Sequence, residues 1–480
     1  MKMQQIKTIL FFVKNYKRYV LAVFILSLLF AVFEGLNVAV LFPIISSVIE
    51  GGVRTGEGSS IIGALNKLIG IIPIKDVFIA ACVFIIIVVI LKNIFGYSYM
   101  VLSAFASYKI WDDVQKRLFS KYINADYRYF LDHKQGEIVY RLFTATASVG
   151  GILRLIPQVL TEVLKILVIG AILFSMSFPV TCGVVIIAGI FYFFTRNISR
   201  KISYFIGKGR MEAGQDQTIL INEMINGIKQ IKVFLAENRW ISNFYKSMDK
   251  YFKLSKKDTL WMNMPVSALE VFALVTLSIF LIFIRKFSPQ NLVSNIPLLA
   301  VFAYAFQRVM PSLSLITNLR MQIMGGLPIL EILHSVINEK MTYLKDGAKV
   351  MSSFNKEIEL DNVSFSYPGR SEALKDISIS FGKNKCIAIV GQSGSGKTTM
   401  VNLLIRLFDP TEGAILVDGI DLKDYKRDSW LGKIGFVSQD TFIFHASVLD
   451  NIAFGLDNVS KEYIIASAKT ANAHDFIMAL

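Results

Sequence analysis

The chain has 480 residues, of which 54% are hydrophobic and 18% are charged, and its formal net charge is +15. An ordinary soluble protein is about 45–50% apolar even with glycine counted, so this composition excludes an ordinary soluble protein and favours a membrane protein. The basic residues lie between apolar runs rather than in one patch, which favours membrane topology over nucleic-acid binding as the reason for the charge.

Six apolar stretches predict helices that cross a membrane, because a crossing needs about 20 predominantly apolar residues. Residues 1–18 are basic and contain no acid, so this flank is expected to stay in the cytoplasm, and six crossings return the C-terminus to the same side. Within a membrane domain of residues 1–335, the predicted spans are residues 19–48, 77–105, 153–178, 179–196, 262–284 and 296–316.

The polar stretches after the second and fourth spans are too long to be simple connectors. At a rise of about 1.5 Å per residue, the roughly 40 residues after the second span form two helical legs of about 30 Å each. We expect the legs to turn at residues 124–130 and, in the later stretch, at residues 237–244. Residues 60–70 are predicted to form a short interfacial helix, and residues 336–354 a linker of mixed charge.

From residue 355 the chain changes to short β-branched runs separated by turns, which is typical of a soluble α/β domain. Cys386 is expected to be buried in one of these runs. The fold class is therefore multidomain, with an all-α domain of six transmembrane helices followed by an α/β domain over residues 355–480. The predicted strands are residues 358–367, 377–381, 386–390 and 414–417, the last closed by a turn at residues 418–419.

A glycine-rich turn follows residues 386–390 and fits the phosphate-loop pattern G-x-x-x-x-G-K-[ST]. Phosphate oxygens are wrapped by backbone N–H groups at a helix N-terminus, and glycine leaves room for that approach. Lys397 is predicted to reach the β- and γ-phosphates of ATP, and the Thr398 hydroxyl to ligate Mg²⁺. The alternative is a loop that binds nothing, which the strand before the turn and the helix after it disfavour. The predicted cofactor-binding residues in the loop are Gly391, Gln392, Ser393, Gly394, Ser395, Gly396, Lys397, Thr398 and Thr399.

With these motifs in place, the chain resembles ABC exporters of the half-transporter type, in which a six-helix membrane domain is fused to one nucleotide-binding domain and works as a dimer. The resemblance covers essentially the whole chain. It implies that Tyr367, within residues 363–368, stacks on adenine. It also implies that Gln439, at the end of residues 436–439, holds Mg²⁺ or the attacking water and so takes part in catalysis. The two predicted turns of the legs resemble the coupling helices of the family.

The sequence departs from this family after Leu480. In the family an LSGGQ-type signature, a strand ending in Asp-Glu and a switch histidine all follow that point, and none of them is in the sequence. We expect the 480 residues to be part of a longer protein and to contain only the N-terminal part of the nucleotide-binding domain. The longer protein is expected to be an ABC-type ATPase, whereas residues 1–480 alone are expected to bind ATP weakly and not to hydrolyse it.

The only signal for a substrate comes from ionisable residues inside the predicted spans. A charge at the bilayer centre costs about 2.5–3.5 kcal/mol on insertion scales, so such residues are expected to pair with each other or to face a polar cavity. One interpretation is structural, in which Lys92 pairs with Glu34 or Glu270. The other is functional, in which Lys92 and Arg308 line a cationic cavity for a phosphate or pyrophosphate headgroup. The sequence leaves both open. The candidate cavity residues are Lys92, Arg308, Glu34 and Glu270.

The membrane half resembles bacterial flippases of lipid-linked oligosaccharides most closely, through residues 119–130, Glu34, Glu270 and residues 308–312. This resemblance implies transport of polyprenyl-pyrophosphate glycans across the bacterial inner membrane, with the nucleotide-binding domain in the cytoplasm. Two alternatives stay open: an exporter of drugs, lipids or peptides with the same architecture, and a non-catalytic subunit that pairs with an intact partner. The expected partners are ATP, the bilayer, a second copy or a related half-transporter, and a lipid-linked substrate; no nucleic acid is expected.

Overall fold

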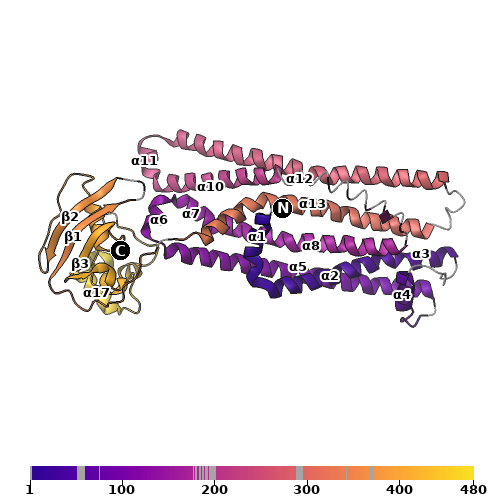
Figure 1. Cartoon of the computed structure of the whole chain (residues 1–480), viewed down its shortest axis with the longest axis horizontal. Helices are drawn as coiled ribbons and strands as arrows, with labels where there is room; N and C mark the ends of the chain where they lie inside the picture. Colours follow the sequence, from indigo (N-terminus) through magenta and orange to yellow (C-terminus); the bar gives the residue numbers. More distant parts are fainter. Residues whose placement is uncertain are drawn as a thin grey trace. The chain divides into compact units, whose positions relative to one another are not determined.

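The computed structural model of the chain divides into two compact units, Met1–Tyr343 and Leu344–Leu480, called unit 1 and unit 2 below. Unit 1 is built from helices, and unit 2 combines a small sheet with short helices (Figure 1). This agrees with the predicted order of the domains, in which a helical domain is followed by an α/β domain. The structure describes residues 3–50, 60–74, 76–176, 202–287, 296–341, 343–367, 371–439 and 441–480, together with residues 178, 181, 182, 185, 189, 193 and 369.

The long helices of unit 1 run side by side as a bundle (Figure 1). In chain order its elements are α1 (Met3–Val13), the 3-10 turn η1 (Lys14–Tyr16), α2 (Lys17–Ala39), α3 (Leu41–Glu50), α4 (Ser60–Ile69), α5 (Val77–Ile123), α6 (Tyr127–Asp132), α7 (Gln135–Val139), the π-helical turn η2 (Tyr140–Ala145), α8 (Thr146–Met176), α10 (Tyr204–Asn226), α11 (Ile228–Val233), α12 (Glu237–Phe287) and α13 (Ile296–Asn338). The largest apolar core joins α5, α8 and α13 through the fully buried Leu118, Val149 and Leu330.

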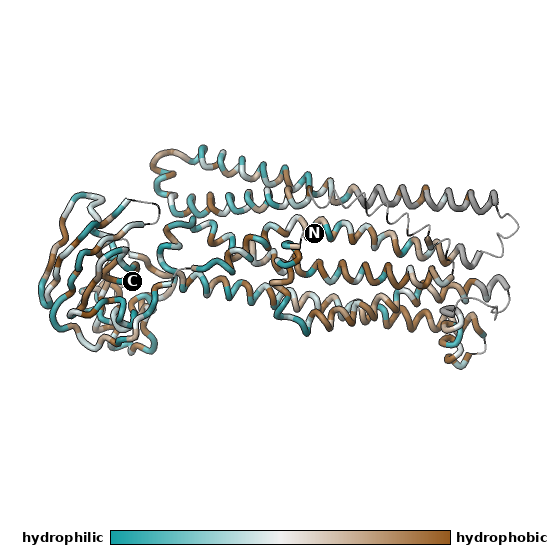
Figure 2. Tube along the Cα trace, viewed as in Figure 1, coloured by the Kyte–Doolittle hydropathy of each residue, from teal (hydrophilic) through white to brown (hydrophobic). Residues whose placement is uncertain are grey.

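Several helices of unit 1 contain apolar stretches long enough to cross a membrane. Figure 2 shows hydrophobic residues along most of α2, the first half of α5 and most of α8, whereas hydrophilic residues mark α10 and the first half of α12. The predicted spans at residues 262–284 and 296–316 fall within α12 and α13, and most of residues 179–196 lies outside the described part of the chain. By length and composition, the candidate spans among the described residues are Met3–Ile45, Val77–Ile123 and Gln135–Met176.

The first predicted span, residues 19–48, is not one continuous helix. α2 ends at Ala39 and α3 begins at Leu41, with a turn at Val40 between them. Pro43 has no backbone N–H, so the carbonyl of Ala39 loses the donor that would normally lie four residues further on. The helical ladder therefore breaks one turn before the proline.

The second hydrophilic stretch turns earlier than its sequence predicts. The first turn lies between Ile123 and Tyr127, within the predicted residues 124–130. The second lies at residues 227–236, and the prediction of residues 237–244 is wrong because Glu237 already begins α12. Gly227 is the C-cap residue of α10, and glycine near the end of a helical pattern is a common sign that the helix stops. The glycine was therefore the signal for the correct position.

Unit 2 is organised around a four-stranded antiparallel sheet with the strand order β2-β1-β3-β4. Its elements are β1 (Glu357–Ser366), β2 (Glu372–Gly382), α14 (Lys397–Leu404), β3 (Glu412–Val417), β4 (Ile420–Asp421), the 3-10 turn η5 (Leu422–Asp424), α15 (Arg427–Leu431), α16 (Val448–Ile452), α17 (Lys461–Thr470) and α18 (His474–Met478). Asp418 and Gly419 both have positive φ, 49° and 82°, and make the tight turn between β3 and β4 that an Asp-Gly pair predicts. Phe365, Leu403 and Phe408 form the centre of its apolar core.

Residues 386–390 do not form the predicted strand. They have no strand partner among the described residues, and their side chains are exposed, with Val390 at 87%. The prediction that Cys386 is buried is also wrong, since its thiol is exposed. A β-branched run is stable as a strand only when neighbours pair its backbone and cover its side chains, and the described sheet supplies neither.

Candidate functional site

The glycine-rich turn of unit 2 leads directly into α14. Gly394 and Gly396 have φ of 84° and 85°, which L side chains rarely adopt. A Cβ on Gly396 would also lie 2.6 Å from Leu374 Cδ2 and 2.7 Å from the Ala373 carbonyl oxygen. Only glycine therefore fits where the turn passes β2, and the backbone of the loop is left accessible.

The start of α14 has the features of an anion-binding helix end. Gly396 is the N-cap residue, and no side chain caps the helix there. The first-turn N–H groups, which include those of Thr398 and Thr399, therefore lack a side-chain acceptor and carry the partial positive charge of the helix dipole. Lys397 adds a positive charge, and its Nζ is held at the loop by donating to the carbonyl oxygens of Gly391 at 2.9 Å and Gln392 at 2.8 Å. This donor set fits the phosphates of a nucleotide.

The remaining loop residues shape the turn. The backbone N–H of Ser395 donates to the Gln392 carbonyl oxygen at 3.2 Å. A Cβ on Gly391 would lie only 2.6 Å from the Ser395 Oγ, so a larger residue there would force the serine side chain to rotate. Ser393 is exposed at the tip of the loop.

The structure brings Tyr367 to the loop but does not bring Gln439 to it. The Tyr367 hydroxyl lies 3.3 Å from Thr399 Oγ1, and its ring packs edge-on against Phe365 and Phe408. Gln439 is exposed in a segment that is neither helix nor strand, and within the described residues no hydrogen bond joins its side chain to the loop. The core of unit 2 thus places Tyr367 beside the phosphate loop, whereas Gln439 is not held near the loop.

Three of the four candidate cavity residues form one cluster in unit 1. Glu34 is 6% exposed, and its carboxylate lies 3.1 Å from Lys92 Nζ and 3.7 Å from Arg308 Nη1. Arg308 also donates from Nε and Nη2 to the Tyr304 hydroxyl, at 3.1 and 2.7 Å. Two cations thus share one carboxylate. The side chain of Glu270 lies outside the described part of the chain.

Tyr304 is the member of this cluster that sequence reasoning missed. It lies four residues before Arg308 on α13, so the two side chains share one face of the helix. That spacing could have revealed the contact with Arg308, but a tyrosine in an apolar span is usually interpreted as a residue that packs in the core. The Tyr304 hydroxyl holds the Arg308 guanidinium in place, and the Arg308 side chain is still 39% exposed.

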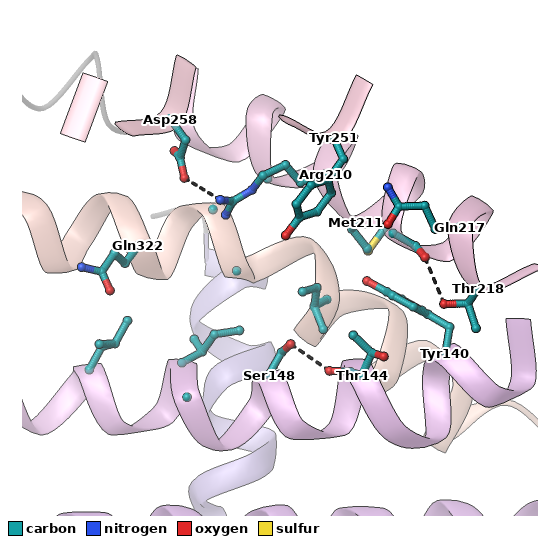
Figure 3. Close-up of a pocket in the computed structure, with 18 of the residues that line it drawn as sticks. Tyr140, Thr144, Ser148, Arg210, Met211, Gln217, Thr218, Tyr251, Asp258 and Gln322 are labelled. Carbon is teal, nitrogen blue, oxygen red and sulfur yellow. Dashed lines mark hydrogen bonds and ion pairs between the residues drawn. The ribbon is translucent and has the colours of Figure 1, made fainter. Parts of the chain in front are cut away.

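Unit 1 also contains a pocket of about 730 Å³ that the sequence did not predict. It lies between η2 and α8 on one side and α10, α12 and α13 on the others (Figure 3). Arg210 and Asp258 form an ion pair in its wall, with Nη1 3.0 Å from Oδ2. Burial raises the pKa of Asp258, and the Arg210 guanidinium opposes that shift. The lining comes from distant parts of the chain, so neither a motif nor a spacing could have revealed it.

Comparisons with known proteins cover both units. The family model for the ABC transporter transmembrane region matches residues 20–309, and the model for the ABC transporter domain matches residues 374–479. The chain is similar in fold to a bacterial Atm1-family ABC exporter with ATP bound, with a TM-score of 0.75 and 20% identity over 97% of this chain and 79% of that one. The predicted fold class, a helical transmembrane domain followed by a nucleotide-binding domain, is confirmed.

Curated relatives with different names match most of the chain. The chain is 26% identical to the heterocyst differentiation ATP-binding protein HepA of Nostoc sp., over 97% of this chain and 76% of that protein. It is 27% identical to an ATP-dependent lipid A-core flippase of Photorhabdus laumondii, over 82% of this chain and 68% of that protein. It is 25% identical to a putative multidrug export ATP-binding/permease protein of Staphylococcus aureus, over 99% of this chain and 80% of that protein.

Proposed function

The chain belongs to the ABC transporter family as a half-transporter of the exporter type, and from this premise we propose that it moves a lipid-linked anionic substrate, such as a polyprenyl-pyrophosphate oligosaccharide. We infer that it works as a dimer in the bacterial inner membrane, with unit 2 in the cytoplasm. The similarity to a lipid A-core flippase supports a lipid substrate, because that relative is named for moving a lipid.

The proposed nucleotide site uses the phosphate loop and Tyr367. ATP supplies the free energy of transport, and Mg²⁺ balances the charge of its phosphates. The N–H groups at the start of α14 and the Lys397 ammonium would bind the phosphates, and Thr398 would offer its hydroxyl to the Mg²⁺ ion. Tyr367 would present its ring to adenine, and Gln439 would orient water or Mg²⁺ once the segment that carries it approaches the loop.

The observation that carries the substrate proposal is the cluster of Glu34, Lys92 and Arg308. One carboxylate neutralises one cation, so the three described side chains retain a net charge of about +1 in an apolar part of unit 1. Such a charge is costly in a bilayer unless a ligand anion balances it. Arg308 has its guanidinium held by Tyr304 and is still partly exposed, which suits the bidentate binding of a phosphate.

A reconstituted ATPase assay tests this proposal. The protein expressed from its whole gene is placed in liposomes, and ATP turnover is measured with and without a polyprenyl-pyrophosphate oligosaccharide. We expect the lipid to stimulate turnover in the wild type. The triple variant Glu34→Gln, Lys92→Met and Arg308→Met removes all three charges together. It should need a lipid concentration at least about tenfold higher for half-maximal stimulation, because a charge-assisted pair contributes about 1.5–3 kcal/mol.

Two controls make the assay specific. Lys397→Ala should abolish ATP turnover with or without lipid, because the loop loses its ammonium. Lys165 lies in a predicted span but pairs with Glu162, at 2.5 Å, and not with the Glu34 cluster. The double variant Lys165→Met and Glu162→Gln should therefore leave stimulation by the lipid unchanged. Equal stimulation of the wild type and the Glu34 triple variant would rule out headgroup binding by the cluster.

Export of apolar or amphipathic drugs is the second candidate, and the ion pairs of the same cluster favour it. Glu34 already engages both cations, which leaves less charge for a substrate than two free cations would. The similarity to a putative multidrug export protein supports this alternative. Stimulation of turnover by cationic or neutral drugs but not by the pyrophosphate lipid, in wild type and triple variant alike, would favour drug export over the flippase proposal.

A further inference from the structure

The pocket of about 730 Å³ in unit 1 has a size typical of small-molecule sites, about 300–1,000 Å³. Its lining includes the hydroxyl or amide groups of Tyr140, Tyr251, Gln217 and Gln322. Hydroxyl and amide groups can each donate and accept hydrogen bonds. The charged lining residues are Arg210 and Asp258, which pair with each other, so the lining carries no net charge.

Tyr140 is the residue that points to a ligand. It is 4% exposed, and no hydrogen bond to its hydroxyl is found among the described residues. Figure 3 shows the hydroxyl groups of Tyr140 and Tyr251 turned toward the same space between the helices. This hydroxyl lines the pocket and can donate a hydrogen bond to a bound group or accept one from it.

The local backbone also marks this place. Tyr140 and Thr144 belong to η2, the π-helical turn between α7 and α8. π-helical turns are rare, and they occur frequently at functional sites. The turn places Tyr140, Thr144 and Ser148 along the wall that faces α10 and α12 (Figure 3). Tyr140 and Thr144 on this turn and Ser148 on α8 are spaced four residues apart and line one wall of the pocket.

We propose that this pocket binds neutral sugar residues, which are the glycan part of the lipid-linked substrate. The inference rests on the proposed function and adds to it a place for the glycan, separate from the Glu34 cluster. A sugar presents many hydroxyl groups that both donate and accept, and the lining offers partners of the same dual kind.

Other ligand classes fit the pocket less well. An anion would have to compete with Asp258 for the guanidinium of Arg210, 3.0 Å away. An apolar ligand would leave the Tyr140 hydroxyl and the Gln217 amide without partners, and sites built for hydrogen bonding reject such ligands strongly. The lining also contains apolar side chains, such as those of Ile152 and Leu155, but its polar groups carry no net charge and so favour a neutral ligand with hydroxyl groups.

The test is direct binding of soluble sugars to the detergent-purified protein. Triacetylchitotriose and maltotriose are titrated, and the Kd is obtained from saturation-transfer NMR signals. We expect at least one trisaccharide to bind. The double variant Tyr140→Phe and Gln217→Met keeps the shape of the side chains and should raise the Kd about tenfold, since each lost hydrogen bond changes it by roughly threefold.

A matched control uses the same substitutions outside the pocket. Tyr245 on α12 is 61% exposed and Gln230 on α11 is also exposed, so Tyr245→Phe with Gln230→Met should leave the Kd unchanged. Unaltered thermal unfolding of the Tyr140 double variant confirms that it is folded. Absence of binding by both trisaccharides, equal binding by wild type and the Tyr140 double variant, or displacement of the sugar by inorganic pyrophosphate would overturn the inference.

A second arm separates this inference from the proposed function. Glycan-free polyprenyl pyrophosphate is compared with the glycan-bearing lipid in the ATPase assay. If both lipids stimulate turnover equally and the Tyr140 double variant responds to both as the wild type does, the sugar pocket is refuted and the flippase proposal stands. If neither lipid stimulates turnover but the trisaccharide binds with the expected loss in the double variant, the flippase proposal fails while the pocket remains a sugar site.

Discussion

Arg406 shows how a single charged residue holds a domain together. It lies just past the C-terminus of α14 with a left-handed φ of 52°, a position that glycine usually occupies. Its side chain is 1% exposed. The guanidinium donates to the carbonyl oxygens of Tyr425 at 2.9 Å and Lys345 at 2.7 Å, and it pairs with Asp409. These bonds offset the backbone strain of about 1–2 kcal/mol.

Replacing Arg406 by methionine should loosen unit 2 without touching the phosphate loop. The methionine fills much of the space but leaves the carbonyl oxygens of Lys345 and Tyr425 without a donor, at a cost of about 2–3 kcal/mol. Hydrogen–deuterium exchange of amides in residues 344–350 and 420–426 should become about 30- to 140-fold faster. Lys433→Met, at an exposed position, is the control and should leave exchange unchanged. Unchanged exchange in Arg406→Met would show that the guanidinium does not support this region.

Residues differ in how far the sequence alone could assign them. The phosphate loop was predictable because its motif is contiguous and each glycine has a local steric reason, as the φ of 85° at Gly396 shows. The role of Arg406 was not predictable, because its partner Lys345 lies 61 residues away. The charge cluster lies between these cases: ionisable residues in apolar spans are visible in the sequence, but the choice of Glu34 as the shared partner depends on how α2, α5 and α13 pack.

At the scale of elements, the contact between α10 and α13 depends on Gly207. A Cβ on Gly207 would lie 1.9 Å from the Gly325 carbonyl oxygen and 2.6 Å from the Gly325 Cα. Both neighbours are backbone atoms, so no side-chain rotation can relieve the overlap. The two helices can pack this closely because residue 207 is glycine, whereas a Cβ on Gly325 would meet no atom closer than 3.6 Å.

Gly207→Ala should therefore separate α10 from α13 and destabilise unit 1. Overpacking costs about 1–3 kcal/mol or more, and here the helices themselves must move. Thermal unfolding in detergent, followed by the loss of the monodisperse peak on size exclusion, should show a clear fall in Tm. The control is Gly170→Ala on α8, where a Cβ would meet nothing within 4 Å and alanine should stabilise the helix by about 0.5–1 kcal/mol. Equal Tm values for both variants would contradict the proposed close packing.

Elements were predicted best where a long periodic pattern decided them. The helices that carry the predicted spans extend well beyond them, as α5 shows by running from Val77 to Ile123. The prediction of a strand at residues 386–390 was wrong, because strand formation depends on partners that the local sequence does not specify. The π-helical turn η2 also had no sequence signal, since it is a small register change inside an otherwise helical pattern. The sugar pocket that it lines was therefore invisible until the helices were in place.

At the scale of the whole molecule, charge distribution predicts orientation. The N-terminal residues 1–18 are basic and free of acids, and such flanks stay on the cytoplasmic side. A nucleotide site must face the compartment that contains ATP. An even number of crossings satisfies both requirements at once, which is why we propose that residues 1–18 and unit 2 lie on the same, cytoplasmic side of the membrane.

The chain's own cysteines provide a test of this orientation. Cys386 is exposed in unit 2, whereas Cys82 lies within a predicted span and is only partly exposed. A membrane-impermeant maleimide should label the protein in inside-out vesicles but not in intact spheroplasts, because an accessible thiol reacts and a membrane-covered one does not. Cys386→Ser should remove the label, and the double variant Cys82→Ser and Cys182→Ser should retain it. Labelling of Cys386 from outside intact spheroplasts would place unit 2 on the wrong side of the membrane for ATP, and the proposed energy source would have to be abandoned with the topology.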